Sequence, residues 1–512
     1  MSPQPPKKSP SGRQPSRPAP RSGQRPGARP VARTAAPLVP ATPGSGMDGY
    51  FSITQRGSTT EREIRGGIAT FFTMAYIVVL NPLILHFAPV PAGAYVPSIP
   101  AIAATTALLA GLMTILMGVV GRYPFALAAG LGINGIVAFQ LAPAIGYAGA
   151  MGVVVLEGLL ITALVVTGIR EALFNAIPLA LKQAIGVGIG LFLAFIGFVD
   201  GGLVHSNAAG APVILGHGGS LATWPHLVFV FCLFLTAILV VRRARGAIII
   251  GIVASTVLAV IIQSIAKLGT QGGADKDPNG WVLNKPSGSF DAKPDLSPIG
   301  HFSIPSVFHA GVLLGILFVF TLMLADFFDT MGTVVAVGGE AGAMTADGQL
   351  PGLRNVLLVD SVAAAAGGAA GVSSNTTYIE SAAGVSEGAR TGLASVVTGV
   401  LFLLTIVISP LANLVPAEAA APVLVIVGFL LMTQVRDIDW DDWDIALPAF
   451  LGMVVMPFTF SITNGIGIAF VSYAILKLAR GRARDVHPLL WVTAALFVVY
   501  FLIVPIRVML NI

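Results

Sequence analysis

The chain has 512 residues, of which 55% are hydrophobic and 10% are charged. Soluble globular proteins carry about 25% charged residues, so this composition excludes a soluble protein and indicates a polytopic membrane protein. At about 20 residues for each crossing, the chain has room for a dozen or more transmembrane helices and for no large soluble domain. The formal net charge of +5 comes largely from the N-terminal tail and therefore indicates no nucleic-acid partner.

The cysteine and histidine content gives no indication of a metal site. The single cysteine, Cys232, lies in an apolar run, which excludes an intrachain disulfide and a cysteine metal site. The seven histidines lack the spacing of metal ligands. No nucleophile–base pair marks an active site. We therefore expect no enzyme, no metal and no organic cofactor.

Residues 1–46 are rich in Pro, Ser, Gly and Arg, with no acidic residue before Asp48. Such a segment cannot bury a core, so we expect a disordered basic tail. It also lacks the apolar centre of a signal peptide. Arg62 and Arg65 stand directly before the first apolar run. Because positive residues flank membrane spans on the cytoplasmic side, the sequence predicts a cytoplasmic N-terminus in a multi-pass protein of the cell membrane, inner or plasma.

The first half of the chain, residues 60–265, contains seven apolar runs long enough to enter a lipid bilayer. Arginines at 122, 170, 242, 243 and 245 fall in the predicted inner loops, which supports this count. An odd number of spans places the polar loop 266–305 outside. The runs cover residues 66–85, 101–120, 125–140, 151–168, 177–198, 226–241 and 247–265.

The second half, residues 306–480, again contains seven apolar runs. The remaining segment, 481–512, includes an apolar run at 489–510 that is either a fifteenth crossing or an appended interfacial helix, unless one long helix has been split at 457–464. The seven runs cover residues 312–337, 356–370, 376–384, 391–411, 419–432, 445–460 and 465–478.

The two halves resemble each other weakly. A shift of about 241 residues places Gly158 on Gly399 and sets Asn134 opposite Asn375. Because each half has an odd number of spans, the repeats are inverted, an architecture that places a substrate site near the midplane, where broken helices meet. The predicted fold is an all-α polytopic membrane protein with two inverted seven-helix repeats and about 14 spans.

Asp326 and Asp329 lie inside the apolar run 312–337. Residues at i and i+3 of a helix share a face, so both carboxylates are expected to point the same way. An ionised Asp in a bilayer core costs at least about 2.5 kcal/mol, so intramembrane acids usually face a cavity, pair with another group or carry a proton. The run therefore predicts a transport site.

Two segments are too rich in glycine or in polar residues for continuous lipid-facing helices, namely LAAGLGINGIVAFQ at 127–140 and GVSSNTTYIESAAGVSEG at 371–388. Non-helical backbone at membrane depth is tolerated only where it lines protein or a water-filled cavity. We therefore expect two broken helices with short extended segments that face one pocket. Their polar members are Asn134, Asn375, Thr376, Thr377 and a third acid, Glu380.

The alternative for these acids is a structural role in ion pairs with buried cations, yet the predicted spans contain almost no basic residue apart from Lys182. Acids without cations fit ligands that donate hydrogen bonds, other cations, or protons. One carboxylate can accept two parallel N–H bonds. The pocket therefore fits a base with paired N–H groups, such as a guanine or hypoxanthine edge, better than an anion.

Two further features are given structural interpretations. Gly186, Gly188 and Gly190 imitate a dinucleotide loop, but they lie in an apolar span without a βαβ context, so we expect close helix packing there. The acidic run RDIDWDDWD at 436–444 is interpreted as a solvated cytoplasmic loop.

Three stretches resemble the AzgA-like purine permeases of the nucleobase/cation symporter group, with looser agreement over about 60–503: GGIATFFTMAYIVVLNP from Gly66, ADFFDTMGTVVAVG from Ala325 and TTYIESAAGVSEGARTGL from Thr376. The resemblance implies two inverted seven-helix repeats divided into a core domain, spans one to four and eight to eleven, and a gate domain, spans five to seven and twelve to fourteen. It also implies proton-coupled uptake of adenine, guanine or hypoxanthine by an elevator-like motion of the core, often in a homodimer.

By position, the resemblance implies that Asn134, Asp326 and Glu380 bind the purine and that Asp329 is needed for transport rather than for binding. The third span departs from the family pattern ALAPGMGLNAFFAF, and Asn375 replaces a common small or apolar residue. These changes border the expected pocket and bear on which purine is preferred. In the third span the differing residues are Ala129, Leu131, Gly135 and Ile136.

Other functions remain open at this point. An anion exchanger of the sulfate-permease type shares the implied architecture, although three acids without a cation in the pocket argue against it. An intramembrane enzyme or a non-transporting receptor lacks a supporting nucleophile or metal cluster. Sodium coupling also remains open beside proton coupling, because oxygen-rich broken helices can hold that ion as well.

Overall fold

The structure is a computed structural model that describes residues 46–168, 177–206, 213–216, 219–244, 246–271, 277–286, 294–345 and 350–502, all within the unit Pro43–Ile512. The predicted basic tail lies outside the described residues except for its last member, residue 46. Parts of the predicted outer loop 266–305 and the end of the segment 481–512 also lie outside them.

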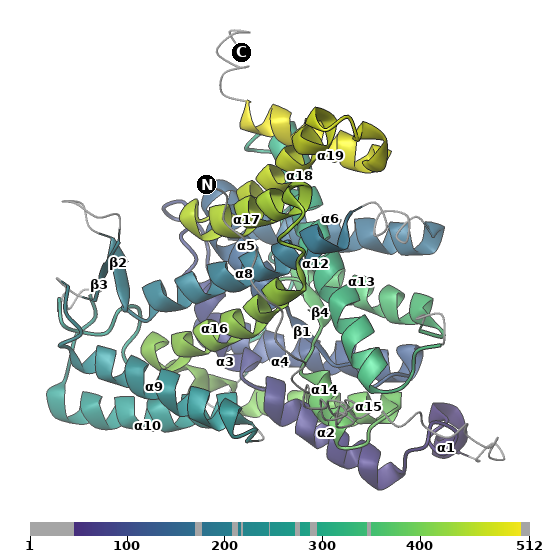
Figure 1. Cartoon of the computed structure of the whole chain (residues 1–512). Helices are drawn as coiled ribbons and strands as arrows, with labels where there is room; N and C mark the ends of the chain where they lie inside the picture. Colours follow the sequence, from purple (N-terminus) through teal and green to yellow (C-terminus); the bar gives the residue numbers. More distant parts are fainter. Residues whose placement is uncertain are drawn as a thin grey trace, which may run out of the picture. The chain divides into compact units, whose positions relative to one another are not determined.

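The first half of the chain consists of helices with one short strand where the third span was predicted, and a small hairpin follows the fifth (Figure 1). Its elements are α1 Met47–Phe51, α2 Thr60–Met74, α3 Ile77–His86, α4 Ile99–Leu116, η1 Met117–Gly121, β1 Leu127–Ala129, α5 Leu131–Ile136, η2 Val137–Leu141, α6 Ala142–Thr167, α8 Leu179–Asp200, β2 Val204–Ser206, β3 Val213–Leu215, α9 Trp224–Val241 and α10 Ala247–Ala266.

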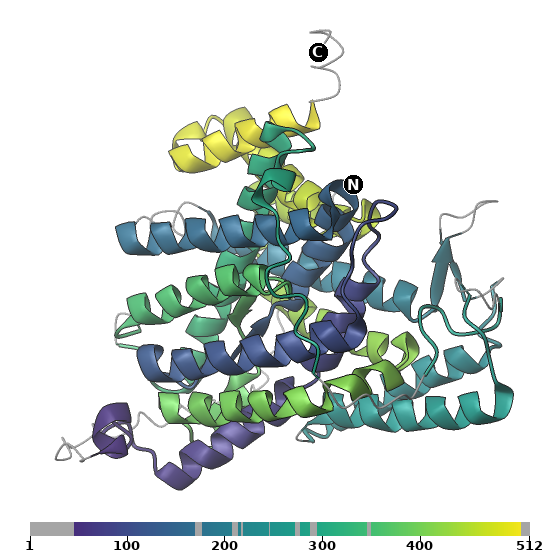
Figure 2. The same cartoon turned by 180° about the vertical axis from the view of Figure 1, so that it is seen from behind.

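The second half repeats this order of elements, seen from behind in Figure 2. Its elements are α11 Ile304–Val307, α12 Val312–Glu340, α13 Leu353–Ala369, β4 Asn375–Thr377, α14 Ser381–Ser386, α15 Gly392–Thr405, η3 Ile406–Leu414, α16 Ala417–Met432, η4 Thr433–Asp437, α17 Trp443–Phe458, α18 Ile462–Ala479, η5 Ala483–Asp485 and α19 Pro488–Phe501.

Each of the fourteen predicted runs coincides with helix or with a strand followed by a half-helix. Among the described residues, ten helices are long and apolar enough to cross a membrane, and one of them, Leu131–Thr167, covers two predicted runs. Three predicted runs contain helices that are shorter than the 18 residues of the shortest of these ten: α13 has 17 residues, α14 has 6 and α17 has 16. The apolar run after residue 488 forms α19, a separate helix of 14 residues that packs on α18.

The two interrupted segments meet through their strands. Strands β1 and β4 pair antiparallel, with Leu127 opposite Thr377 and Ala129 opposite Asn375, and Gly130 N continues the ladder to Ser374 O at 2.9 Å. The half-helices α5 and α14 begin directly after the strands. Both backbone breaks are therefore satisfied by each other, and the predicted pair of broken helices with extended segments is confirmed.

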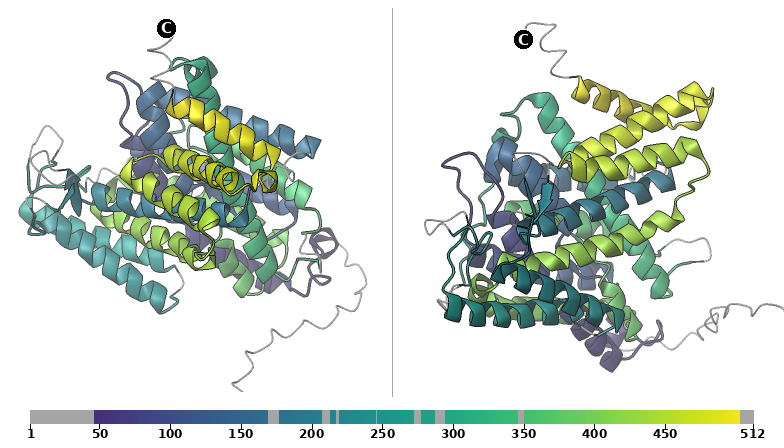
Figure 3. Two further views of the ribbon diagram at one scale, coloured as in Figure 1. Left: turned by 45° about the horizontal axis from the view of Figure 1, so that its top comes forward. Right: turned by 60° about the vertical axis from the view of Figure 1, so that its left-hand side comes forward.

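The helix contacts repeat with the two halves exchanged. In the first group of helices, α4 packs on α15 and α6 packs on α13 (Figures 1 and 3). In the second group, α9 packs on α16 and α8 packs on α17. Within each half, α9 packs on α10 and α17 packs on α18. Helix α8 also packs on its own counterpart, α16. This exchange is the pattern expected of two inverted repeats.

Glycines permit the closest of these contacts. A Cβ on Gly158 of α6 would lie 2.3 Å from the backbone N of Ala365 in α13, and one on Gly399 of α15 would lie 2.6 Å from the carbonyl O of Gly111 in α4. The shift of 241 therefore relates equivalent contacts in α6 and α15. Small residues are the usual means of close helix approach in membranes. Gly190 likewise packs on Gly428 of α16, which confirms the interpretation of its glycine run as helix packing.

The same shift is wrong for the broken segments. Asn134 lies in the half-helix α5, whereas Asn375 lies in the strand β4, whose counterpart is β1. A shift that aligns the apolar helices does not align the broken segments, because the turns between them differ in length. Hydrophobic periodicity fixes the face of a helix and does not fix the length of a loop.

The helices form the two predicted sets, with α2–α6 and α12–α15 in the core and α8–α10 and α16–α18 in the gate. The site lies on the core side, next to α8. Gly132 and Gly135 of α5 face Ile189 and Phe192 of α8, where added Cβ atoms would come within 2.8 Å and 3.1 Å. Gly135, one of the departures from the family pattern, thus leaves room for an aromatic ring of the gate.

Candidate substrate site

Helix α12 brings Asp326 and Asp329 into the core one turn apart. Asp326 is buried, and its Oδ2 accepts a hydrogen bond from Ser374 Oγ at 3.1 Å. Asp329 remains exposed. The two carboxylates thus differ in access: one is held against the segment before β4, and the other is open to solvent or to a ligand.

Glu380 occupies the N-cap position of α14, directly after β4. Its Oε1 accepts a hydrogen bond from the hydroxyl of Tyr76, and its backbone carbonyl lies 3.4 Å from Thr73 Oγ1. The side chain is half-buried. Asp329 lies close enough to both Asp326 and Glu380 to interact with them electrostatically. The structure therefore brings together all three acids that the sequence analysis selected.

Asn134 lies in α5 and is fully buried. Its Nδ2 donates to Asn81 Oδ1 at 2.8 Å, and Asn81 Nδ2 donates in turn to Thr106 Oγ1 at 2.8 Å and to the carbonyl of Val372 at 3.1 Å. This chain of amides fixes the orientation of Asn134. Its Oδ1 has no hydrogen-bond partner among the residues that the structure describes and so remains an acceptor for a ligand.

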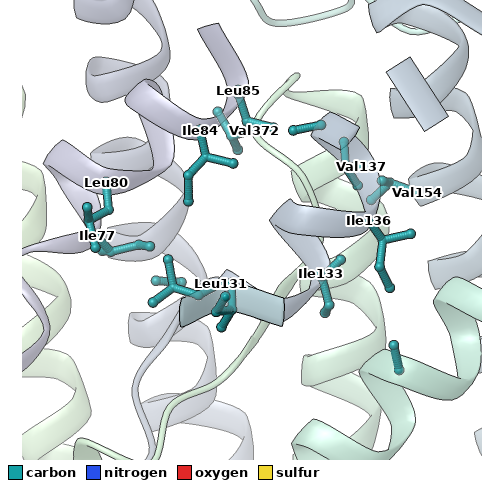
Figure 4. Close-up of a cluster of buried hydrophobic side chains, with 14 of the residues drawn as sticks. Ile77, Leu80, Ile84, Leu85, Leu131, Ile133, Ile136, Val137, Val154 and Val372 are labelled. Carbon is teal, nitrogen blue, oxygen red and sulfur yellow. The ribbon is translucent and has the colours of Figure 1, made fainter. Parts of the chain in front are cut away.

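An apolar shell surrounds this amide pair. Figure 4 shows residues of α5 and η2 opposite residues of α3, with Val372 between them. In such surroundings an unsatisfied polar atom costs free energy, about 1–3 kcal/mol for an amide. The labelled residues are Ile77, Leu80, Ile84, Leu85, Leu131, Ile133, Ile136, Val137, Val154 and Val372.

The three residues predicted to support the pocket form β4 and are all buried. Thr376 Oγ1 lies 2.8 Å from Thr330 Oγ1 of α12, so it ties the strand to the helix that carries the acids. Side chains alternate along a strand, which directs Asn375 and Thr377 to the other face. Within the described part of the chain, neither side-chain amide atom of Asn375 has a hydrogen-bond partner. Of these residues, Thr376 alone is bonded directly to α12 by its side chain.

The sequence analysis missed three residues that position the site. Asp360 of α13 is buried; it accepts from Thr330 Oγ1 at 2.7 Å and from the backbone N of Thr377 at 3.1 Å, so it joins α12, α13 and β4. Tyr76 and Asn81 orient Glu380 and Asn134. All three are polar residues inside apolar runs, which is the signal that would have found them.

The surroundings of the site contain hydroxyls and amides. The ion pairs of the described residues involve Glu387, Asp437, Asp442 and Asp444, and none of them involves Glu380 or Asp329. Helix α12 contacts both α5 and α14, so these acceptors lie on neighbouring elements, and Glu380 has no paired cation among the described residues. The arrangement can receive a neutral ligand that donates several hydrogen bonds, or protons.

The Xan_ur_permease model, described as a permease family, matches residues 61–474. The chain belongs to this permease family. The match covers both repeats and every site residue named above, so the predicted resemblance to the AzgA-like permeases is confirmed. The site described here is therefore part of a membrane transporter.

Relatives within the permease family span almost the whole chain. The guanine/hypoxanthine permease PbuG of Bacillus subtilis (strain 168) is 36% identical over 464 residues, which cover 89% of this chain and 99% of that protein. The adenine permease AdeP of Escherichia coli (strain K12) is 36% identical over 460 residues, covering 89% and 96%.

Among solved structures, the transmembrane domain of a cyanobacterium bicarbonate transporter, BicA, matches with a TM-score of 0.56 and 14% identity, covering 80% of this chain and 97% of that one. At this identity the match shows the fold alone. It is the fold of inverted repeats with core and gate domains, which confirms the predicted fold class.

Proposed function

We propose that this permease imports purine nucleobases across the cell membrane by proton symport. The observation that supports the proposal is that Asn134, Asp326 and Glu380 lie on neighbouring elements where two broken helices meet. Purine nucleobases are neutral planar molecules whose edges present N–H donors, and carboxylates accept such donors in pairs. The relatives with 36% identity, named as guanine/hypoxanthine and adenine permeases, support this substrate class.

In the proposed complex, Asp326 and Glu380 accept N–H groups of the base. Asn134 Oδ1, for which the described residues offer no hydrogen-bond partner, accepts a further donor or a bridging water. The Tyr76 hydroxyl holds Glu380 in place, so its remaining oxygen can meet the ligand without the entropy cost of ordering a free side chain. Asn375 is the first residue of β4, the strand that precedes Glu380, and is a supporting group in this proposal.

Asp329 is the proposed proton carrier. It is exposed, and it interacts electrostatically with Asp326 and Glu380, so taking up a proton relieves the repulsion among three acids. A protonated, loaded core is also cheaper to move past apolar surroundings than an ionised one. Proton uptake from outside would therefore favour the inward movement of the substrate.

The contact between α5 and α8 supports an elevator-like motion of the core against the gate. The core contributes Gly132 and Gly135 there, and the gate contributes the apolar side chains Ile189 and Phe192. A surface without large side chains on one partner can slide without breaking hydrogen bonds. The arginines before the first span and in the predicted inner loops support a cytoplasmic N-terminus.

The test is uptake of labelled adenine, guanine, hypoxanthine, xanthine and uracil by cells that lack their own carriers, at two external pH values, with and without a protonophore. We expect concentrative uptake of at least one purine that rises at low external pH and collapses with the protonophore. Sodium replacement would distinguish the coupling ion. Uptake of sulfate or bicarbonate without purine uptake would instead support the anion exchanger, and absence of any uptake would contradict both proposals.

A further inference from the structure

The segment before the first span folds against the core. Helix α1 and the following turn pack Phe51 and Ile53 on Leu393 of α15, and the hydroxyl of Tyr50 donates to the carbonyl of Val119 at 3.0 Å. This contact borders an open cavity of about 370 Å³ between α1, the end of η1 and the start of α13. The residues that matter here are Tyr50, Arg56, Arg122, Tyr123, Gly352 and Asn355.

Two guanidinium groups line this cavity. Arg56 lies over the ring of Tyr123, 4.3 Å from its centroid, and Arg122 lies over the ring of Tyr50 at 4.6 Å. Arg56 Nη1 donates to the carbonyls of Arg122 and Arg390 at 2.6 Å and 3.3 Å. A guanidinium has five N–H donors, so both groups retain donors after these contacts. The aromatic rings hold the two cations in place.

Among the described residues that line the cavity, no acidic residue offsets these charges. The cavity lining contains two arginines and no carboxylate, and neither arginine forms an ion pair among the residues that the structure describes. By contrast, Arg65, which also lies before the first span, pairs with Glu387 at 3.0 Å. The concavity therefore concentrates positive potential at one point of the core.

The start of α13 adds to this potential. Gly352, at φ 73°, is the N-cap residue and offers no side chain to the first turn of the helix. The Tyr123 hydroxyl fixes this turn by donating to the carbonyl of Pro351 at 2.8 Å. A helix N-terminus carries about half a positive charge and presents backbone N–H groups to anions. Asn355 contributes an amide to the same lining.

We propose that this cavity binds the phosphate group of a phosphorylated molecule. Paired guanidinium groups beside a helix N-terminus match a tetrahedral dianion in charge and in donor geometry. The volume lies within the range of about 300–1,000 Å³ that small-ligand sites occupy. The phosphate can come from a soluble sugar phosphate or from a lipid headgroup. The site is separate from the substrate pocket, so this inference goes beyond the proposed transport function.

The test measures binding and requires no transport. The full-length protein in detergent is titrated calorimetrically with inorganic phosphate and with ribose 5-phosphate, neither of which carries a purine. A second arm compares its thermal stability in phosphatidylcholine nanodiscs with and without phosphatidic acid. We expect saturable binding of a phosphate in at least one arm, and we expect it to weaken with added salt.

The informative variant is Arg122→Asn, because Arg122 has φ 58° and asparagine adopts this left-handed conformation readily. The variant removes the charge without straining the turn, and we expect binding to fall by about tenfold or more. The matched control is Arg243→Asn, at φ 55° in the turn after α9, which should leave binding unchanged. If Arg122→Asn weakens the binding of the soluble phosphates, the ligand is a soluble phosphate. If it weakens only the effect of phosphatidic acid in nanodiscs, the ligand is a lipid headgroup. No saturable binding in either arm, or equal loss in both variants, would overturn the proposal.

Discussion

Glu380 and Asp444 are both carboxylates in apolar parts of the chain, and their surroundings are opposite. The side chain of Asp444, at the start of α17, is 2% exposed and lies 3.3 Å from Lys477 Nζ and 2.9 Å from Arg480 Nε. The partner of Glu380 is the neutral hydroxyl of Tyr76, and the carboxylate keeps accessible surface. Both acids thus lie in apolar parts of the chain, while their accessibility and the neighbouring charge differ.

The comparison shows which buried acid is structural. The carboxylate surrounded by cations joins α17 to α18 through its ion pairs, so it offers nothing to a ligand. A carboxylate without a paired cation keeps its acceptor capacity for a substrate or a proton. The interpretation of the run 436–444 as a solvated loop is wrong at its last residue, because Asp444 is drawn into the protein by Lys477.

The largest effect is expected from neutralising two of the acids of the proposed pocket. Asp326→Asn and Glu380→Gln should reduce purine uptake by about a hundredfold or more, because each removes a carboxylate acceptor from the proposed pocket. Both variants should reach the membrane and unfold near the temperature of the parent protein. Uptake of labelled purine per folded molecule is the measurement. Undiminished uptake by either variant would remove that residue from the site.

The opposite result is expected for the paired acid. Asp444→Asn leaves Lys477 buried without its counter-charge and should lower the free energy of unfolding by about 3–5 kcal/mol. Unfolding in detergent by heat and by denaturant measures this loss. Uptake per folded molecule should change little. The double variant Asp444→Leu with Lys477→Met should recover much of the stability, whereas a stable Asp444→Asn would show that the pair contributes nothing.

Asp329→Asn separates binding from coupling. In the proposed cycle the parent protein takes up more purine when external pH is lowered from about 8 to 6, because proton entry drives substrate entry. The variant should bind purine with an affinity close to that of the parent but should lose concentrative uptake and its pH dependence. Binding to the purified protein and uptake at both pH values measure the two properties. A variant with the pH response of the parent would exclude Asp329 as the carrier.

The smallest effect is expected for the hydroxyl that orients Glu380. Tyr76→Phe removes one hydrogen bond to a carboxylate, worth about 1.5 kcal/mol, so the KM for purine should rise by roughly tenfold or less. The matched control is Tyr147→Phe, whose parent hydroxyl is buried and donates to the carbonyl of Gly371 at 2.7 Å rather than to a carboxylate. The control should lower stability and leave KM unchanged. Equal effects in both variants would make the role of Tyr76 purely structural.

Much of the site could be predicted because its chemistry violates the pattern of its surroundings. Asp326, Asp329 and Glu380 are visible as acids in apolar runs, and Asn134 as an amide in a glycine-rich break. Tyr76, Asn81 and Asp360 were missed, although they lie in similar runs. Their roles come from contacts with residues that are distant along the chain. Tyr76 and Glu380, for example, are 304 residues apart, so no local pattern relates them.

The sequence by itself determined the membrane class, the number and order of the apolar runs, the two broken segments and the acids within them, because hydrophobicity and helix-breaking residues act locally. Only the tertiary structure decided which acids have cations beside them, since Lys477 and Asp444 are 33 residues apart along the chain. It also decided the register of β1 on β4, which depends on turn lengths and on hydrogen bonds between the two halves. Periodicity specifies the face of a helix, and packing specifies what that face meets.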